Sequence, residues 1–169
     1  RQVAEHLHML GHRKVGFVIA EHSIVNPEAR VRARHFTESW IQCGGLKDRV
    51  EILIWDADAT DFVDWYPKRN GITALVSWSE SGAFAILERA RSIKVNVPIE
   101  LSVVGFDSST YCDLMQPRLT AARQPVEEMA AKGTEFLIRL IQSPEMDPLQ
   151  FVFPSTLDIR ESTARPPQG

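Results

Sequence analysis

Polar and aromatic side chains stand at the ends of several apolar runs in this sequence, where they could form a binding site. Asp107 follows the run Leu101–Phe106, Trp55 ends a second run, Trp78 follows a third, and Arg32 lies a little beyond a fourth. A carboxylate accepts hydrogen bonds from neighbouring hydroxyls, a guanidinium donates a fork of them, and an indole covers an apolar ring face. These groups together have the chemistry that binds a sugar.

Each of these residues also has a purely structural explanation. Trp55 and Trp78 could pack in the core or at its rim, and Asp107 could cap the loop that begins at Ser108. Further polar side chains fall at the same strand ends and could either join the site or face solvent: His22, Asp56, Ser79, Arg30 and Arg34.

Strands and helices alternate regularly through the first two thirds of the chain. The predicted strands are Val15–Ala20, Val50–Trp55, Ile72–Ser77 and Leu101–Asp107. A first helix closes at Gly11, and the helices between the strands are predicted from Pro27 to Gly44, over Thr60–Tyr66 and over Glu80–Ile93. Apolar strands alternating with helices predict an α/β fold with a doubly wound parallel sheet, Rossmann-like, with helices on both faces. Ligands bind at the carboxyl ends of such strands.

The remainder of the chain departs from this alternation. A short run, Leu119–Gln124, leads into a predicted helix, Val126–Ile141, which carries an apolar stripe. Two short strands are predicted after it, Gln150–Phe153 and Thr156–Arg160. The pattern leaves open whether this helix covers the sheet described above or belongs to another one.

Composition describes a soluble globular protein of 169 residues, with 44% hydrophobic and 24% charged residues. Its 19 basic and 22 acidic residues give a net charge of -3, so we do not expect this chain to hold DNA by itself. Cys43 and Cys112 are too few for a disulfide framework, which favours a reducing cytoplasm. No apolar run approaches the ~20 residues of a membrane span. Because the sequence opens on Arg1, it could be part of a longer chain.

The motifs of common enzyme classes are missing from the sequence. It contains no G-x-S-x-G elbow and no glycine-rich phosphate loop after a predicted strand. His8 and His12 have a spacing that metal ligands can use, but no third ligand accompanies them. We therefore expect no catalytic residue, no cofactor and no metal.

Four segments, in this order, resemble the signature of LacI-type (LacI/GalR) transcriptional regulators. They are Leu10–Val15, Ser102–Asp107, Pro117–Thr120 with Gln124-Pro125, and Ile159–Thr163. Their order and spacing cover the chain from about Arg1 to Pro166. The resemblance is to the carboxyl-terminal half of the effector-binding core, which is similar to periplasmic binding proteins.

The resemblance implies a set of ligand-binding residues. Arg32 corresponds to an arginine that grips the ligand, Asp107 to an aspartate that binds its hydroxyls, and Gln124 to a glutamine at a crossover between two lobes. Trp55 or Asp56 would take the place of an aromatic contact. Trp78-Ser79 stands where the family usually has a polar pair such as Asn-Asp, and His35 where it has glycine, so the ligand could differ from a plain hexose.

The resemblance also implies how the chain is divided. Residues 1–124 would form the carboxyl-terminal lobe, 125–155 a helix and strand of the other lobe, and 156–169 the return crossover and tail. A sugar-like effector would bind between the lobes, and a homodimer would use the helix Glu80–Ile93 and the loop Ser108–Met115. Operator DNA would be contacted only by a headpiece outside this chain. The alternative is the sugar-binding protein of a transporter, which shares the fold.

Overall fold

A computed structural model describes residues 1–20, 23–55 and 71–167 of the chain. Within these residues a six-stranded sheet has the order β2-β1-β3-β4-β5-β6. Its strands are β1 (Val15–Ala20), β2 (Val50–Trp55), β3 (Ala74–Ser77), β4 (Ser102–Phe106), β5 (Thr120–Arg123) and β6 (Thr156–Asp158). The first five run parallel, and β6 pairs antiparallel with β5. The predicted doubly wound parallel sheet is therefore confirmed.

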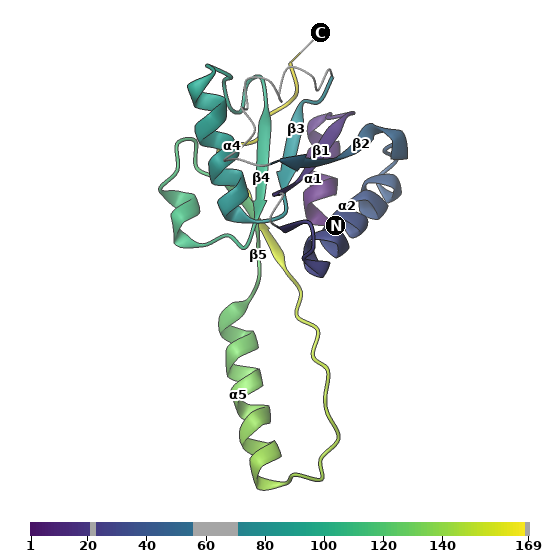
Figure 1. Cartoon of the computed structure of the whole chain (residues 1–169), viewed down its shortest axis with the longest axis vertical. Helices are drawn as coiled ribbons and strands as arrows, with labels where there is room; N and C mark the ends of the chain where they lie inside the picture. The colour runs from purple at the N-terminus through teal and green to yellow at the C-terminus, as the bar shows by residue number, and fades with distance from the viewer. Residues whose placement is uncertain (21–22, 56–70, 168–169) are drawn as a thin grey trace.

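Helices cover both faces of this sheet (Figure 1). Side chains of α1 (Gln2–Leu10) and α2 (Pro27–Gln42) pack with one set of strand residues, whereas those of α4 (Glu80–Ser92) pack with the other set. On β1, Phe17 belongs to the first cluster and Val18 to the second. Because successive strand residues point to opposite faces, strands that are apolar throughout have both faces buried.

Local sequence signals set the helix boundaries. Asn26 caps α2 by accepting a hydrogen bond from the Glu28 amide at 2.9 Å, and Pro27 occupies the first helical turn. Gly11 closes α1 with a φ of 102°, a left-handed value that favours glycine. The predicted helix Thr60–Tyr66 lies outside the described residues.

The longest helix, α5 (Val126–Gln142), stands away from the sheet (Figure 1). None of its residues is buried, and its apolar stripe is largely exposed, with Leu137 at 55% and Ile141 at 71%. The chain returns beside α5 to β6 as an extended segment, residues 143–155, without regular structure. The α5 helix and this segment are called the arm below.

The predicted strand Gln150–Phe153 is wrong, because these residues pair with no strand among the described residues. Backbone groups of a strand must be matched by a neighbouring strand, and in this structure the arm lies beyond the edge of the sheet. Phe151 instead packs its ring against Phe136 of α5, with the ring centroids 6.0 Å apart.

Candidate functional site

Asp107 is the centre of a polar cluster at the carboxyl edge of the sheet. Arg32, on α2, donates to both of its carboxylate oxygens, Nη2 to Oδ1 at 3.2 Å and Nη1 to Oδ2 at 3.4 Å. Gln124, just after β5, donates from Nε2 to Asp107 Oδ1 at 2.6 Å. The structure thus brings together three of the predicted site residues from α2, the end of β4 and the end of β5.

The backbone at this centre is strained. Asp107 has a φ of 82° and Ser108 a φ of 27°, both in the left-handed region, where each non-glycine residue costs ~1–3 kcal/mol. Several hydrogen bonds hold the turn: the Asp107 amide donates to the Ala122 carbonyl at 2.8 Å, and the Ser108 hydroxyl donates to Asp158 Oδ2 at 2.6 Å. The turn therefore orients the Asp107 carboxylate.

Aromatic rings flank the guanidinium of Arg32. Its Cζ atom lies 5.0 Å from the centroid of the Phe106 ring and 5.9 Å from that of the Trp78 ring. Arg32 Nη1 also donates to the Trp78 carbonyl at 2.7 Å. Trp78 therefore lies beside the Asp107 cluster, as predicted. Phe106 was missed by the sequence analysis, although it directly precedes Asp107.

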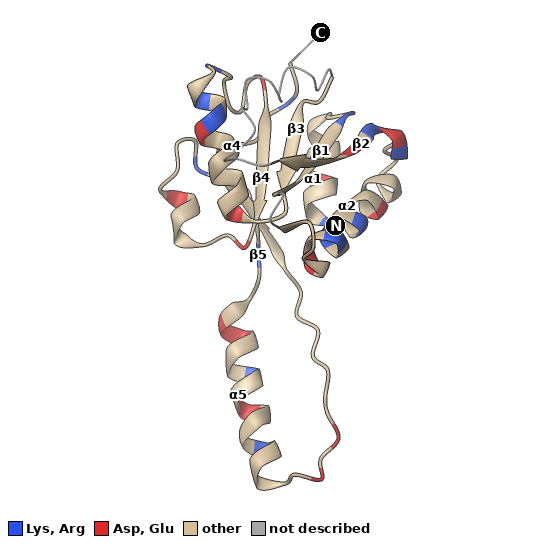
Figure 2. Cartoon of the chain, viewed as in Figure 1, with Lys and Arg blue, Asp and Glu red and all other residues tan. Residues whose placement is uncertain are grey.

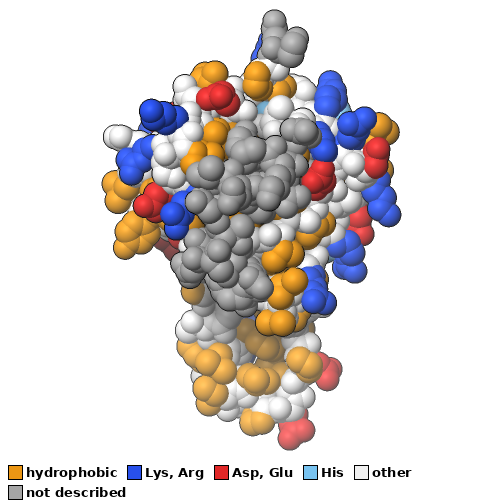
Figure 3. Space-filling view, turned by 45° about the horizontal axis from the view of Figure 1, so that its top comes forward, with side chains coloured by type: hydrophobic (Ala, Val, Ile, Leu, Met, Phe, Trp, Pro, Cys, Tyr) orange, Lys and Arg blue, Asp and Glu red, His pale blue; other side chains and the backbone are white. Residues whose placement is uncertain are grey.

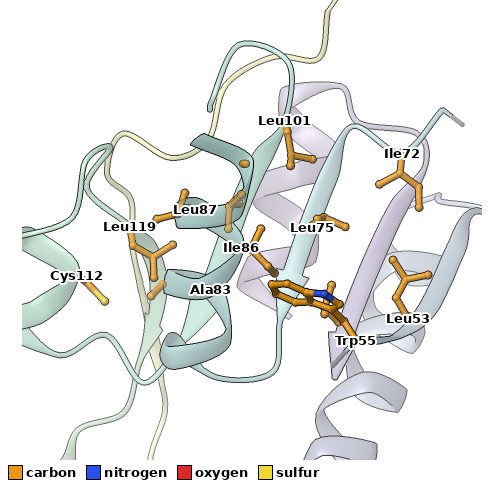
Figure 4. Close-up of a cluster of buried hydrophobic side chains, with 14 residues drawn as sticks. Leu53, Trp55, Ile72, Leu75, Ala83, Ile86, Leu87, Leu101, Cys112 and Leu119 are labelled. Atoms are coloured by element: carbon orange, nitrogen blue, oxygen red, sulfur yellow. The ribbon is translucent and has the colours of Figure 1, made fainter. Parts of the chain in front are cut away.

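Trp55, which the sequence predicted as a ligand-binding residue, does not face this cluster. Its side chain is 3% exposed and packs in the buried cluster beneath α4, near Leu75 and Ile86 (Figure 4). The cause is strand alternation: Leu53 and Trp55 share the inward face of β2, whereas Ile52 and Ile54 share the other face.

The other polar residues considered at this edge have varied positions. Arg30 donates to the Ile24 carbonyl at 2.9 Å, and Arg34 lies 3.8 Å from Glu38 on the exposed side of α2. Ser79 caps α4 by accepting from the Gly82 amide at 3.2 Å. His35 is exposed near Arg32 and helps to line a hollow of about 190 Å³. His22 and Asp56 lie outside the described residues.

A second polar network continues from Ser108. Arg160 Nη1 donates to the Ser108 hydroxyl at 3.1 Å, and Arg160 Nε donates to Asp113 Oδ1 at 2.6 Å. Arg123 Nε donates to Asp158 Oδ2 at 2.7 Å. Burial raises the pKa of Asp158, but the hydrogen bonds from Arg123 and Ser108 outweigh it, so its pKa lies below the usual value. Ionised Asp158 thus joins β5 and β6 to the turn at Asp107.

The described part of the chain offers no group of three or more His, Cys, Asp or Glu side chains placed to hold a metal ion. His12 is fully buried, with Nδ1 2.8 Å from Thr73 Oγ1 and Nε2 3.0 Å from the Ala164 carbonyl. Burial lowers its pKa to about 4, so this ring is neutral at pH 7. None of the described helices is both long and apolar enough to cross a membrane.

Comparison with known proteins gives a family and a fold. Residues 4–163 match the model of the periplasmic binding protein-like domain family. An uncharacterized HTH-type transcriptional regulator from Streptomyces limosus is 30% identical over 170 residues, which cover 98% of this chain and 48% of the relative. The chain thus spans about half the length of this curated relative.

Solved structures show the same fold. A LacI family regulator from Enterococcus faecium with bound ribose has a TM-score of 0.81 and 20% identity, covering 97% of this chain and 61% of that one. A dimeric Lac repressor with a C-terminal deletion has a TM-score of 0.79 and 22% identity, covering 98% and 60%. The resemblance to LacI-type regulators that the four segments indicated is confirmed.

Proposed function

Because the chain belongs to the periplasmic binding protein-like domain family, we propose that it is the effector-binding and dimerisation part of a LacI-type transcriptional regulator. The similar regulator from Streptomyces limosus supports this function over that of a transporter's sugar-binding protein. The proposed activity is ligand binding in the cytoplasm, without catalysis. Operator DNA would be bound by a headpiece outside these residues.

The observation that carries the proposal is the convergence of Arg32 and Gln124 on the Asp107 carboxylate. A carboxylate, a guanidinium and an amide offer both acceptors and donors to the hydroxyls of a sugar-like ligand. The Arg32 contacts to Asp107, at 3.2 and 3.4 Å, are longer than the ~2.7–2.9 Å of strong charge-assisted hydrogen bonds. Ligand hydroxyls can therefore replace them at little cost. Trp78 and Phe106 would supply apolar surface.

The exposed arm supports a site shared by two lobes. We assign residues 1–124 to one lobe, 125–155 to the other and 156–169 to the return crossover and tail. The apolar stripe of α5 would pack against the sheet of the second lobe, since such a stripe is stable only when covered. The described residues would then form one wall of the effector site, which fits the small hollow beside Arg32.

Ligand binding would act by shifting populations of lobe arrangements. An effector that contacts both lobes favours the closed arrangement by its difference in affinity for the two states. Such coupling between sites is typically ~1–3 kcal/mol. Gln124 lies where the chain passes from the sheet to the arm and touches Asp107, so it would sense both the ligand and the lobe arrangement.

A homodimer would form through α4 and the loop after Asp107. Tyr111 and Leu114 of this loop are 64% and 75% exposed. Leu114, together with Phe84 and Met115, lines a groove of about 550 Å³ beside α4. Apolar side chains gathered around a groove are typical of subunit contacts.

The test is a thermal-shift screen of the full-length regulator against neutral sugars, sugar phosphates and nucleosides. Asp107→Asn keeps a residue that tolerates the left-handed backbone but removes the charge, and Arg32→Gln removes the guanidinium. We expect a stabilising ligand whose shift is lost in both variants. Arg34→Gln, on the exposed side of the same helix, is the matched control and should keep the shift.

A ligand whose shift survives both substitutions would show that the Asp107 cluster is not the effector site. The absence of any shift across the three ligand classes would count against a sugar-like effector.

A further inference from the structure

A second pocket, of about 500 Å³, lies at the opposite edge of the sheet from Asp107. Its walls include the residues just before β1 and β2, whereas Asp107 follows β4, so in a parallel sheet the two sites lie at opposite strand ends. The pocket is lined by residues that include His8, Arg13, Trp40, Gly44, Gly45 and Arg49. It is called the basic pocket here.

Two buried polar atoms beside the basic pocket have no hydrogen-bond partner among the described residues: Trp40 Nε1 and His8 Nδ1. Trp40 is fully buried, and its indole N–H can act only as a donor. Leaving such a donor without an acceptor destabilises the folded state, so buried polar groups in native structures are almost always hydrogen-bonded. The two rings touch edge to face, with centroids 5.5 Å apart, which places both atoms in one small region.

The charges around the basic pocket are of one sign. Arg13 and Arg49 contribute guanidinium groups, and the described residues that line it include no carboxylate. The nearby Asp48 lies 3.9 Å from Arg49 Nε and is 75% exposed, so it neutralises Arg49 weakly. Figure 2 shows two basic residues and one acidic residue at the turn between α2 and β2, where Lys47, Asp48 and Arg49 follow one another.

The carbonyl groups at the ends of the two helices beside this pocket do not compete with a ligand for Arg13 and Arg49. Both α1 and α2 end here, and unpaired carbonyls at a helix end favour cations. The last carbonyls are capped by the chain itself, however: the Gly11 amide donates to the His8 carbonyl at 3.0 Å, and the Gly45 amide to the Trp40 carbonyl at 2.9 Å. Arg13 Nη1 donates to the His12 carbonyl at 3.0 Å, so the other N–H groups of Arg13, with those of Arg49, are the ones that would hold a ligand.

Glycine at position 45 allows this arrangement. A Cβ atom there would lie 2.2 Å from Trp40 Nε1, which no side chain can tolerate. The backbone of the Gly44-Gly45 turn therefore lies against the indole N–H at the wall of the pocket. A small displacement of the turn would expose the donor to a bound ligand.

We propose that the basic pocket binds a small oxyanion, either free phosphate or the phosphate group of a metabolite. Arg13 and Arg49 would hold its oxygens with charge-assisted hydrogen bonds, and the indole N–H of Trp40 would satisfy its missing partner on the same anion. This site is separate from the Asp107 cluster and does not depend on the proposed effector function.

The test is a titration of the ¹⁵N-labelled chain, followed through the indole N–H resonance of Trp40, which a Trp40→Phe variant assigns. One arm uses inorganic phosphate and a second uses glycerol 3-phosphate, each against sodium chloride at matched ionic strength. We expect a saturable shift with both. Arg13→Gln and Arg49→Gln should each weaken binding about fivefold or more, because each removes a charged donor.

Arg139→Gln on α5 removes the same charge far from the pocket and should leave the affinity unchanged. Tighter binding of glycerol 3-phosphate would identify a metabolite phosphate as the ligand, and equal binding would identify free phosphate. A shift that does not saturate, or that is the same in the two arginine variants, would overturn the proposal.

Discussion

The Asp107 carboxylate is held by residues that are far apart in the sequence. Arg32 precedes it by 75 positions and Gln124 follows it by 17. The position of Asp107 after an apolar run was enough to predict it as a site residue, since parallel strands place ligands at their carboxyl ends. The strained turn at Asp107 and Ser108 could not be predicted, because it depends on Asp158, 50 residues beyond Ser108.

Ser108 offers a test of that turn. Replacing it with alanine removes the donor to Asp158 and the acceptor for Arg160, in a buried position. We expect Ser108→Ala to lower the free energy of unfolding by about 1–3 kcal/mol in chemical denaturation. Ser81→Ala, on the exposed start of α4, is a control that should change it by less than about 0.5 kcal/mol.

His12 predicts a pH dependence of stability. Its pKa falls from 6.5 to about 4 on folding because the ring is buried, so below pH 6.5 the unfolded chain binds a proton that the folded chain does not. The free energy of unfolding should therefore decrease as the pH falls from about 6.5 to about 4, by about 3 kcal/mol from this residue. Denaturation of the chain at a series of pH values measures it.

The His12→Gln variant separates this effect from other titrating groups. It should be less stable at pH 7, having lost ring hydrogen bonds, and should show a smaller decrease between pH 6.5 and 4. His35→Gln, at an exposed position, should keep the full decrease. An unchanged slope in His12→Gln would refute the assignment.

Trp55 shows why residue type and position near a strand end are not enough. The same strand end can carry a side chain toward the ligand edge or into the layer beneath a helix. Strand alternation settles the outcome, and at Trp55 it places the indole under α4 (Figure 4).

At the scale of elements, the sequence predicted β1 and β2 with their observed bounds and α2 with its buried face. These elements carry strong local signals, such as the capping Asn26 and the stripe of Ala29, Ala33, Phe36 and Trp40. The arm is different: the period of α5 was predictable from its stripe, but that stripe is largely exposed among the described residues. The predicted strand at Gln150–Phe153 was wrong because the backbone groups of a strand must hydrogen-bond to a neighbouring strand.

The stripe of α5 predicts self-association of the chain. Figure 3 shows hydrophobic side chains gathered on the arm, and Leu137, Ile138 and Ile141 are all more than half exposed. Leu137→Glu with Ile141→Glu should reduce self-association in sedimentation velocity, because charges oppose burial of the stripe. The melting temperature should change little, since neither side chain is buried.

Arg139→Glu places a negative charge on the other side of α5, where Arg139 pairs with Glu135, and should leave the association state unchanged. Association that persists in the double variant would show that another surface drives it.

At the scale of the whole molecule, one polar network joins three regions with separate proposed roles. Ser108 follows Asp107, which is proposed to bind the effector, Asp158 lies on strand β6, and Asp113 belongs to the loop proposed to contact a second subunit. Arg160 bonds to Ser108 and Asp113, and its side chain is 9% exposed. The loop at Asp113 is therefore bonded to the same network as the turn at Asp107.

This arrangement predicts a localised effect of Leu114→Asp on assembly. The charge should weaken the proposed dimer of the full-length regulator at least tenfold in sedimentation equilibrium, a loss of about 1.4 kcal/mol. Binding to the Asp107 cluster should persist, because Leu114 is 75% exposed and is not among the residues that contact Asp107. A dimer of unchanged affinity would mean that the subunits meet elsewhere.

The arm leaves the sheet and re-enters it through neighbouring strands, β5 and β6, whose residues Arg123 and Thr156 are paired. A segment attached through two adjacent strands can rotate about that single attachment, which here lies beside the Arg123–Asp158 ion pair. Gln124 is close to this attachment, and its Nε2 is 2.6 Å from Asp107 Oδ1. The tip of the arm is far from the attachment (Figure 1). A rotation that moves the tip far would displace the Gln124 amide only slightly. A small displacement of Gln124 at Asp107 would therefore accompany a large movement of the tip of the arm.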